Sequence, residues 1–236
     1  MFDLGTGARY FGATQAAPYK GSVLLSHLHW DHTQGLPFFT PILKPGSELD
    51  IYAPQQDDGR SLSRVFEEMI RPPVFPVTIA QFAGTVRYHE LNDDDFQIGG
   101  VSVKSRLVPH LGPTLGYRVE WQGRSVAYIS DHQQPHDGSC SMTQGARDLA
   151  EGVDLLIHDS QYTAAEFPMK NNWGHCTVDY AMWLAQECGV KTLALFHHDP
   201  TRTDTDLDEL HRAAAFADGD GPRVIAAREG LVIDLD

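Results

Sequence analysis

Apolar residues in this chain fall into short runs that polar, helical or loop-like stretches separate. Short apolar or alternating runs bounded by turn residues are typical of β-strands. The β-rich part extends from Val86 to Ile129, and Gln122-Gly123 between two such runs predicts a hairpin turn. The predicted strands are Val23–Ser26, Leu49–Ala53, Val101–Val103, Leu115–Trp121, Arg124–Ile129, Val153–His158, Thr192–Phe196, Val224–Ala227 and Leu231–Leu235, and the predicted helices are Leu62–Ile70, Thr177–Glu187 and Asp206–Ala217.

This alternation of strands and helices predicts an α/β protein with two sheets and helices packed outside them. Thr177 is a candidate N-cap of its helix, which we expect to end near Gly189. The chain has 236 residues and 42% hydrophobic content, enough for a large core. No Ser/Gly-rich linker divides it, so we expect one domain over residues 1–236.

Charge narrows the partners that we expect. The chain carries 32 acidic and 18 basic residues, a formal net charge of −14. A general polyanion binder normally shows a basic face, so this balance argues against that class. A small anionic substrate remains compatible, because bound cations can reverse the local sign of charge inside an acidic protein.

Cysteine usage and the absence of long apolar runs bear on the compartment. The three cysteines, Cys140, Cys176 and Cys188, form no CxxC pair, which favours a reduced compartment over a disulfide framework. No apolar run approaches the roughly 20 residues that span a bilayer. Met1 leads directly into Phe2-Asp3 without a signal peptide. We therefore expect a cytoplasmic protein with no membrane partner.

The most informative segment is Ser26–His32, which places three imidazoles and a carboxylate directly after the apolar run Val23-Leu24-Leu25. Imidazole and carboxylate are ligands that zinc and similar ions prefer. Side chains alternate on an extended segment, so His27 and His29 point the same way. A bend after them presents Asp31 and His32 from a new direction, and the segment can serve two ions. The alternative is a surface histidine cluster.

Three candidate ligands downstream weaken that alternative. His110, Asp131 and His197 each follow an apolar run that ends a predicted strand. Polar groups placed after buried strands commonly build a site on one rim of a sheet, because the sheet fixes their positions. His198 is a second candidate at the last position, and we favour His197. Each residue alone could be an ordinary loop residue, but together they complete two coordination shells.

These motifs resemble the metallo-β-lactamase superfamily of dinuclear metal hydrolases, and Phe2–Gly7 resembles its first motif. The resemblance implies a four-layer αββα sandwich, here without the first N-terminal strand or strands, and Asp3 as an orienter of ligands. An exposed sheet edge invites pairing, so a homo-oligomer is expected. The expected cofactors are two divalent ions, zinc first and manganese or iron as alternatives. The implied ligands are His27, His29 and His110 for one ion, Asp31, His32 and His197 for the other, and Asp131 between them.

The resemblance also implies hydrolysis by a hydroxide that bridges the two ions. Aspartate at position 131 favours phosphodiester or lactone hydrolases, since the antibiotic-degrading relatives generally carry a thiolate there. Leu155–Ser160 and Gly174–Thr177 resemble ribonuclease Z segments, which makes His175 the implied general acid and Asp159 its orienting carboxylate. Here Asp replaces the longer Glu of that family. The candidate catalytic residues are therefore Asp31, Asp159 and His175.

One departure from ribonuclease Z bears on the substrate. Only 27 residues separate Asp131 from Asp159, which leaves little room for the flexible arm that grips tRNA in that family. With the acidic balance, this favours a small anionic phosphodiester, such as a cyclic nucleotide, and we do not expect tRNA. The predicted function is a metal-dependent phosphodiesterase. The alternatives are a lactone or ester hydrolase and a catalytically silent metal-binding protein.

Overall fold

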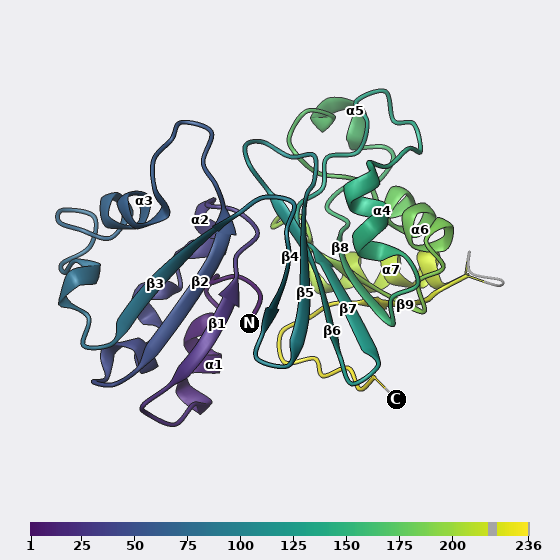
Figure 1. Cartoon of the computed structure of the whole chain (residues 1–236). Helices are drawn as coiled ribbons and strands as arrows, with labels where there is room; N and C mark the ends of the chain where they lie inside the picture. The colour runs from purple at the N-terminus through teal and green to yellow at the C-terminus, as the bar shows by residue number, and fades with distance from the viewer. Residues whose placement is uncertain (217–220, 236) are drawn as a thin grey trace. The chain divides into compact units, whose positions relative to one another are not determined.

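The computed structural model describes residues 1–216 and 221–235, and the chain divides into two compact units. The first unit, residues 1–92, contains a parallel sheet with the strand order β1-β2-β3 (Figure 1). Its elements are α1 (Ala8–Thr14), β1 (Lys20–Leu24), α2 (Trp30–Thr33), the 3₁₀ helices η1 (Leu36–Phe38) and η2 (Thr40–Leu43), β2 (Glu48–Pro54), α3 (Leu62–Met69), η3 (Ile79–Gln81) and β3 (Thr85–Leu91).

Helix α3 shows how the apolar pattern forms this unit. Ser61 caps its N-terminus, and the buried side chains of Leu62, Val65 and Phe66 follow the spacing of one helical face. They pack into the core cluster of the first unit together with buried residues of the sheet. The predicted helix Leu62–Ile70 is confirmed and ends one residue earlier.

The start of the chain lies beside β1 and brings a carboxylate to the end of that strand. Phe2 forms an isolated parallel bridge with Leu24, and the backbone nitrogen of Asp3 donates to the carbonyl of Leu24 over 3.1 Å. Asp3 then turns with a φ of +50°, in the left-handed region that few non-glycine residues adopt. This turn places its carboxylate against Ser26, at the carboxyl end of the parallel sheet.

The second unit, residues 93–236, contains a mixed sheet with the order β10-β9-β8-β7-β6-β5-β4. The four strands from β7 to β10 are parallel, whereas β4, β5, β6 and β7 pair antiparallel. Its elements are β4 (Asp95–Ile98), β5 (Val101–Leu107), β6 (Leu115–Trp121), β7 (Arg124–Ile129), α4 (Gln144–Ala150), β8 (Leu155–Asp159), α5 (Phe167–Lys170), α6 (Val178–Glu187), β9 (Thr192–Phe196), α7 (Asp204–Phe216) and β10 (Arg223–Ala226).

Helices α4, α6 and α7 share one core with this sheet and lie along it in Figure 1. Thr177 caps α6 by accepting a hydrogen bond from the nitrogen of Tyr180, as the sequence predicts, and Gly189 follows the helix with a φ of +61°. The hairpin between β6 and β7 is also confirmed. Gln122 and Gly123 have φ angles of +50° and +78°, as a tight turn with two left-handed residues requires.

The candidate site residues of the second unit lie at one edge of this sheet, where four of its strands end. Strands β5, β7, β8 and β9 all run in the same direction, because β5 and β7 each pair antiparallel with β6 and the others are parallel to β7. Their carboxyl ends therefore meet at a single edge. His110 and Asp131 follow β5 and β7, Asp159 ends β8, and His197 follows β9 directly. This topology places the four residues at one rim of the sheet, as we expected for His110, Asp131 and His197.

Near the C-terminus, one predicted strand is absent from the described residues and one predicted helix is present with other bounds. The strand predicted at Leu231–Leu235 is wrong: these residues form no strand, and the side chains of Leu231 and Val232 are 37% and 79% exposed. Alternation alone does not make a strand where no neighbouring strand or core buries the apolar side chains. Of the predicted helix Asp206–Ala217, the structure shows Asp204–Phe216, and Ala217 lies outside the described residues.

The α/β prediction with two sheets is confirmed. None of the helices in the described part of the chain has the length and apolarity that crossing a bilayer requires. The expectation of one domain over residues 1–236 stays a prediction.

Candidate metal centre

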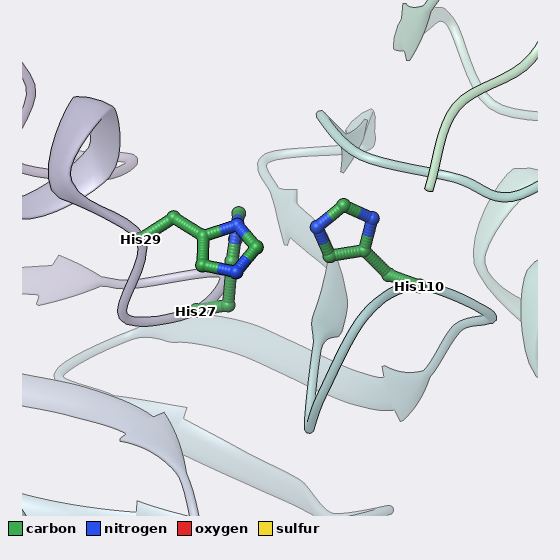
Figure 2. Close-up of side chains that lie close together, drawn as sticks. All are labelled: His27, His29 and His110. Carbon is green, nitrogen blue, oxygen red and sulfur yellow. The ribbon is translucent and has the colours of Figure 1, made fainter. Parts of the chain in front are cut away.

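In the first unit, the candidate donors lie on the short connection between β1 and α2. His27 is almost fully buried, and its Nε2 lies 2.8 Å from Nδ1 of His29. Figure 2 shows these two rings together on that connection. His29 is the N-cap residue of α2 and has extended backbone angles, so the chain turns into the helix immediately after it. The strand thus delivers two imidazoles side by side, and Asp31 and His32 follow from the helix.

His32 is oriented by the carboxylate of Asp3. Its Nδ1 lies 2.6 Å from Oδ2 of Asp3, which also accepts the hydroxyl of Ser26, while the nitrogen of Ser26 donates to Oδ1. Nδ1 therefore carries the proton, and Nε2 lies 3.0 Å from Oδ2 of Asp31. A neutral ring would direct its lone pair at a carboxylate oxygen. A cation or a proton between the two groups stabilises this geometry.

In the second unit, the carboxylate of Asp131 faces two imidazoles in the same way. Its Oδ1 lies 3.8 Å from Nε2 of His110 and 3.4 Å from Nε2 of His197. The opposite ring nitrogens are engaged, since Nδ1 of His110 donates to the carbonyl of Gly174 over 2.7 Å and Nδ1 of His197 lies 3.1 Å from Oε1 of Gln161. Figure 2 shows His110 on the loop that follows β5.

These contacts test whether a divalent cation suits the donors of each unit. Ring nitrogens that carry lone pairs face the carboxylate of Asp31 in the first unit and the buried carboxylate of Asp131 in the second, and partners on the far side of each ring fix the tautomer. Metal-binding histidines typically have such an outer hydrogen bond. Within the second unit, the donor atoms of His110, Asp131 and His175 all lie within 4.8 Å of one another. The donor set fits a cation.

His197 also has a φ of +54°, an uncommon backbone state for a non-glycine residue.

His175 and Asp159, predicted as an acid and its orienter, are in contact. Nδ1 of His175 lies 2.9 Å from Oδ2 of Asp159 and 3.8 Å from Oδ1 of Asp131. The shorter aspartate therefore reaches the ring. Asp159 is fully buried, and the backbone nitrogens of His132 and Gln161 each donate to its carboxylate over 3.0 Å.

Sequence reasoning missed two buried histidines behind Asp159. Nδ1 of His158 lies 2.7 Å from the carbonyl of Asp159, and its Nε2 lies 2.9 Å from Nδ1 of His132. Burial lowers the pKa of both rings, so both are neutral at pH 7, and burial raises the pKa of the neighbouring Cys176 thiol. The available signal was the pair of dipeptides Asp131-His132 and His158-Asp159 at the ends of two predicted strands.

The two adjacent histidines after β9 have different surroundings. His197 faces Asp131, whereas Nε2 of His198 lies 3.1 Å from the carbonyl of Ala227, and burial lowers the pKa of His198. Asp199 accepts hydrogen bonds from Lys170 and Thr201, which hold its pKa well below the usual range. The contact with the carbonyl of Ala227 shows that His198 binds the segment after β10, so His197 is the histidine of this pair that faces Asp131.

Residues 11–198 match the Beta-lactamase superfamily domain, which is most of the chain. The chain belongs to the beta-lactamase superfamily. This membership confirms the family that the motifs resemble, and it makes the chain a hydrolase of the metallo-β-lactamase fold.

A curated relative agrees with this membership. The chain is 25% identical over 285 aligned positions to a protein named Ribonuclease Z from Synechococcus sp. (strain CC9311), with 100% of this chain and 89% of the relative covered.

Solved structures show the same fold. The metallo-beta-lactamase fold protein YhfI from Bacillus subtilis has a TM-score of 0.72 and 20% identity, covering 98% of this chain and 84% of that one. A diphosphatase from the PhnP family has a TM-score of 0.69 and 20% identity, covering 100% and 79%. Zinc-bound PqqB from Methylobacterium extorquens has a TM-score of 0.71 and 18% identity, covering 99% and 82%.

Proposed function

We propose that this superfamily member holds two divalent cations, zinc first, with manganese or iron as alternatives. Support comes from the donor sets of both units and from the superfamily match, which begins in the first unit and ends in the second. A structural neighbour binds zinc, and His/Asp sites accept these metals. The proposed ligands are His27, His29 and His110 for one ion and Asp31, His32 and His197 for the other, with Asp131 shared.

We propose that the reaction is hydrolysis of a phosphodiester. Bound divalent cations supply Lewis-acid polarisation of the phosphoryl group and lower the pKa of water toward 7. Asp31 has an exposed side chain, and its carboxylate can accept a hydrogen bond from the attacking water. Two dications outweigh the carboxylates of Asp31 and Asp131, and the remaining positive charge suits an anionic substrate.

The observation that carries this proposal is the 2.9 Å contact between His175 and Asp159. A sugar hydroxyl is a poor leaving group, and proton donation as the P–O bond breaks contributes about 10²–10⁴ in rate. Asp159 holds Nδ1 of the ring and fixes its orientation. Nε2 of His175 then carries the proton that goes to the leaving oxygen.

We propose a small phosphodiester, such as a cyclic nucleotide, as the substrate. The net charge of −14 disfavours a large polyanion. Only 27 residues separate Asp131 from Asp159, and they include a loop and the seven-residue helix α4, which leaves little room for an arm that grips tRNA. The curated relative is named a ribonuclease, and RNA contains the same type of bond.

The test loads the protein with zinc or manganese and supplies bis-p-nitrophenyl phosphate, cyclic nucleotides and a homoserine lactone. We expect about two ions per chain and turnover of phosphodiesters that His29→Ala abolishes. His136→Ala, which changes an exposed histidine outside the proposed site, is the matched control. Phosphodiester turnover no higher than that of His29→Ala would reject the proposal.

Other outcomes of the same test identify the alternatives. Lactone turnover that survives His175→Ala would indicate a lactone or ester hydrolase. Two ions per chain without any hydrolysis would indicate a silent metal-binding protein. The proposal of a homo-oligomer is separate, and light scattering coupled to size-exclusion chromatography tests it, since a monomer mass would contradict it.

A further inference from the structure

Behind the carboxylate of Asp159, two buried imidazoles form a short hydrogen-bonded chain. Nδ1 of His132 lies 2.9 Å from Nε2 of His158, whose Nδ1 lies 2.7 Å from the carbonyl of Asp159. The backbone nitrogen of the same His132 donates to Oδ2 of Asp159 over 3.0 Å. His132 therefore holds Asp159 twice, directly through its backbone and indirectly through the ring of His158.

The chemistry of the groups fixes the direction of these hydrogen bonds. A carbonyl oxygen only accepts, so Nδ1 of His158 carries a proton. Nε2 of the neutral ring is then an acceptor, so Nδ1 of His132 is the donor. One tautomer is imposed on each ring, and the ring of His132 selects the state in which His158 can bind Asp159.

Two polar rings are costly to bury here. His132 is 1% exposed and His158 is fully buried, and the ring of Tyr180 packs edge-on against His132 at 5.5 Å. Apolar side chains of similar volume would fill this core without the desolvation cost of the ring nitrogens. The backbone nitrogen of His132 and Nδ1 of His158 both bind Asp159, so this buried pair is built around one candidate catalytic residue.

We propose that His132 and His158 are positioning residues, which hold Asp159 so that its Oδ2 keeps the ring of His175 oriented for proton donation. This inference rests on the proposed function, in which His175 is the general acid. Without the donor at His132, Nε2 of His158 can take the proton instead, and the contact with the carbonyl of Asp159 is lost. The backbone at Asp159 is then less firmly held and can shift the carboxylate away from Nδ1 of His175, although the backbone nitrogens of His132 and Gln161 still donate to it.

The experiment compares metal-loaded His132→Leu with wild type on two substrates. With a 2′,3′-cyclic nucleotide, whose leaving group needs a proton, we expect kcat to fall about 10- to 100-fold with KM unchanged. With bis-p-nitrophenyl phosphate, whose leaving group needs little protonation, we expect less than about a 3-fold fall. In a His175→Ala background the same change should have no further effect. If His132→Leu lowers kcat equally on both substrates, the proposal is overturned. It is also overturned if His132→Leu lowers kcat by the same factor when His175 is already alanine.

Two further variants guard against a folding defect. The amide nitrogen of Asn can replace Nδ1 of His132, so His132→Asn should retain activity within about 3-fold, whereas Gln misplaces its amide and His132→Gln should behave like His132→Leu. His136→Leu is the control for a histidine-to-leucine change in the same loop. If His132→Gln matches wild type, the proposal is wrong.

Proton NMR of the hydrogen-bonded imidazole N–H groups gives a readout that needs no substrate. We expect the Nδ1 proton of His175 to shift or broaden in His132→Leu and to keep its position in His136→Leu. An unchanged resonance overturns the positioning role even if the enzyme is active. Conversely, a shifted resonance in a protein that hydrolyses no phosphodiester supports the positioning and rejects the proposed reaction.

Discussion

The two units supply their candidate ligands in different ways. In the first unit, all donors come from the continuous segment between His27 and His32. In the second unit, they come from the ends of separate strands, and His110 and His197 lie 87 positions apart in the chain. The first set depends on local backbone geometry, whereas the second depends on correct strand order and register.

The units also differ in the group that binds Nδ1 of each imidazole, the ring nitrogen that points away from the candidate metal site. Asp3 binds Nδ1 of His32 in the first unit, whereas the carbonyl of Gly174 and the side-chain amide of Gln161 bind His110 and His197 in the second. A carboxylate raises the basicity of a ligand more than a neutral dipole does. We infer that the first unit tunes its candidate ligand His32 by charge, whereas the second unit orients His110 and His197 by neutral dipoles.

The largest expected effect comes from Asp131→Asn, which removes the charge shared by the rings of the second unit. We expect activity to fall about 10³-fold, because several kcal/mol of cation-dependent stabilisation is lost. Metal content should fall by about one ion per chain, with little change in Tm. Elemental analysis and thermal unfolding measure both. Unchanged metal content would contradict the proposal that Asp131 serves as a metal ligand.

Much of the candidate centre could be predicted because its signals are local. The run from His27 to His32 is contiguous, and the ends of strongly apolar strands mark His110, Asp131 and His197. Directional rules for strands then place those ends on one edge of a sheet. Caps such as Thr177 and the turn at Gln122-Gly123 were equally readable, since each depends on neighbouring residues only.

What could not be predicted depends on contacts between distant residues. The ring of His158 meets that of His132 because Ile129 pairs with His158 in the β7–β8 ladder, and this register is not visible in the chain. The reach of Asp159 to His175 depends on the same packing. The strand predicted at Leu231–Leu235 failed for the opposite reason, since its apolar pattern was present but no neighbouring strand pairs with it in the described part of the chain.

A smaller effect is expected from Asp3→Ala in the first unit. The carboxylate accepts hydrogen bonds from Ser26 and His32, so its loss frees the tautomer of His32. We expect metal affinity to fall about 10- to 100-fold. Competition with a fluorescent chelator measures this change. Asp3→Asn tolerates the positive φ and retains one acceptor oxygen, so an effect equal to that of Asp3→Ala would show that charge, and not shape, matters.

Gly174→Ala tests positioning by backbone in the second unit. Gly174 has a φ of +95°, and a Cβ there would lie 2.5 Å from Cε1 and Nδ1 of His110. We expect a loss of about 1–3 kcal/mol in unfolding free energy and weaker metal binding. Gly189→Ala is the matched control, because its φ is +61° but no atom lies within 4 Å of its Cβ. Equal metal affinity in the two variants would rule out positioning of His110 by the Gly174 backbone.

The smallest expected effect is on stability and concerns Asp154, a carboxylate in the second unit at the edge of the sheet opposite Asp131 and Asp159. Asp154 precedes β8 and accepts hydrogen bonds from Lys191 and Ser125, with the Lys191 bond first in lowering its pKa to about 2 from 3.8. Because the folded pKa is below the unfolded one, this stabilisation is full above pH 4 and disappears as the pH falls toward 2.

Asp154→Asn should therefore lose about 1 kcal/mol at pH 7, since the exposed ammonium of Lys191 is screened by solvent, and almost nothing at pH 2. Activity at pH 7 should match wild type, because Asp154 lies at the strand end opposite Asp131 and Asp159. Urea unfolding at pH 7 and pH 2 measures the difference in unfolding free energy between wild type and Asp154→Asn. A loss of metal or of activity would mean that the two edges of the sheet are coupled, so the site would no longer depend on strand ends alone.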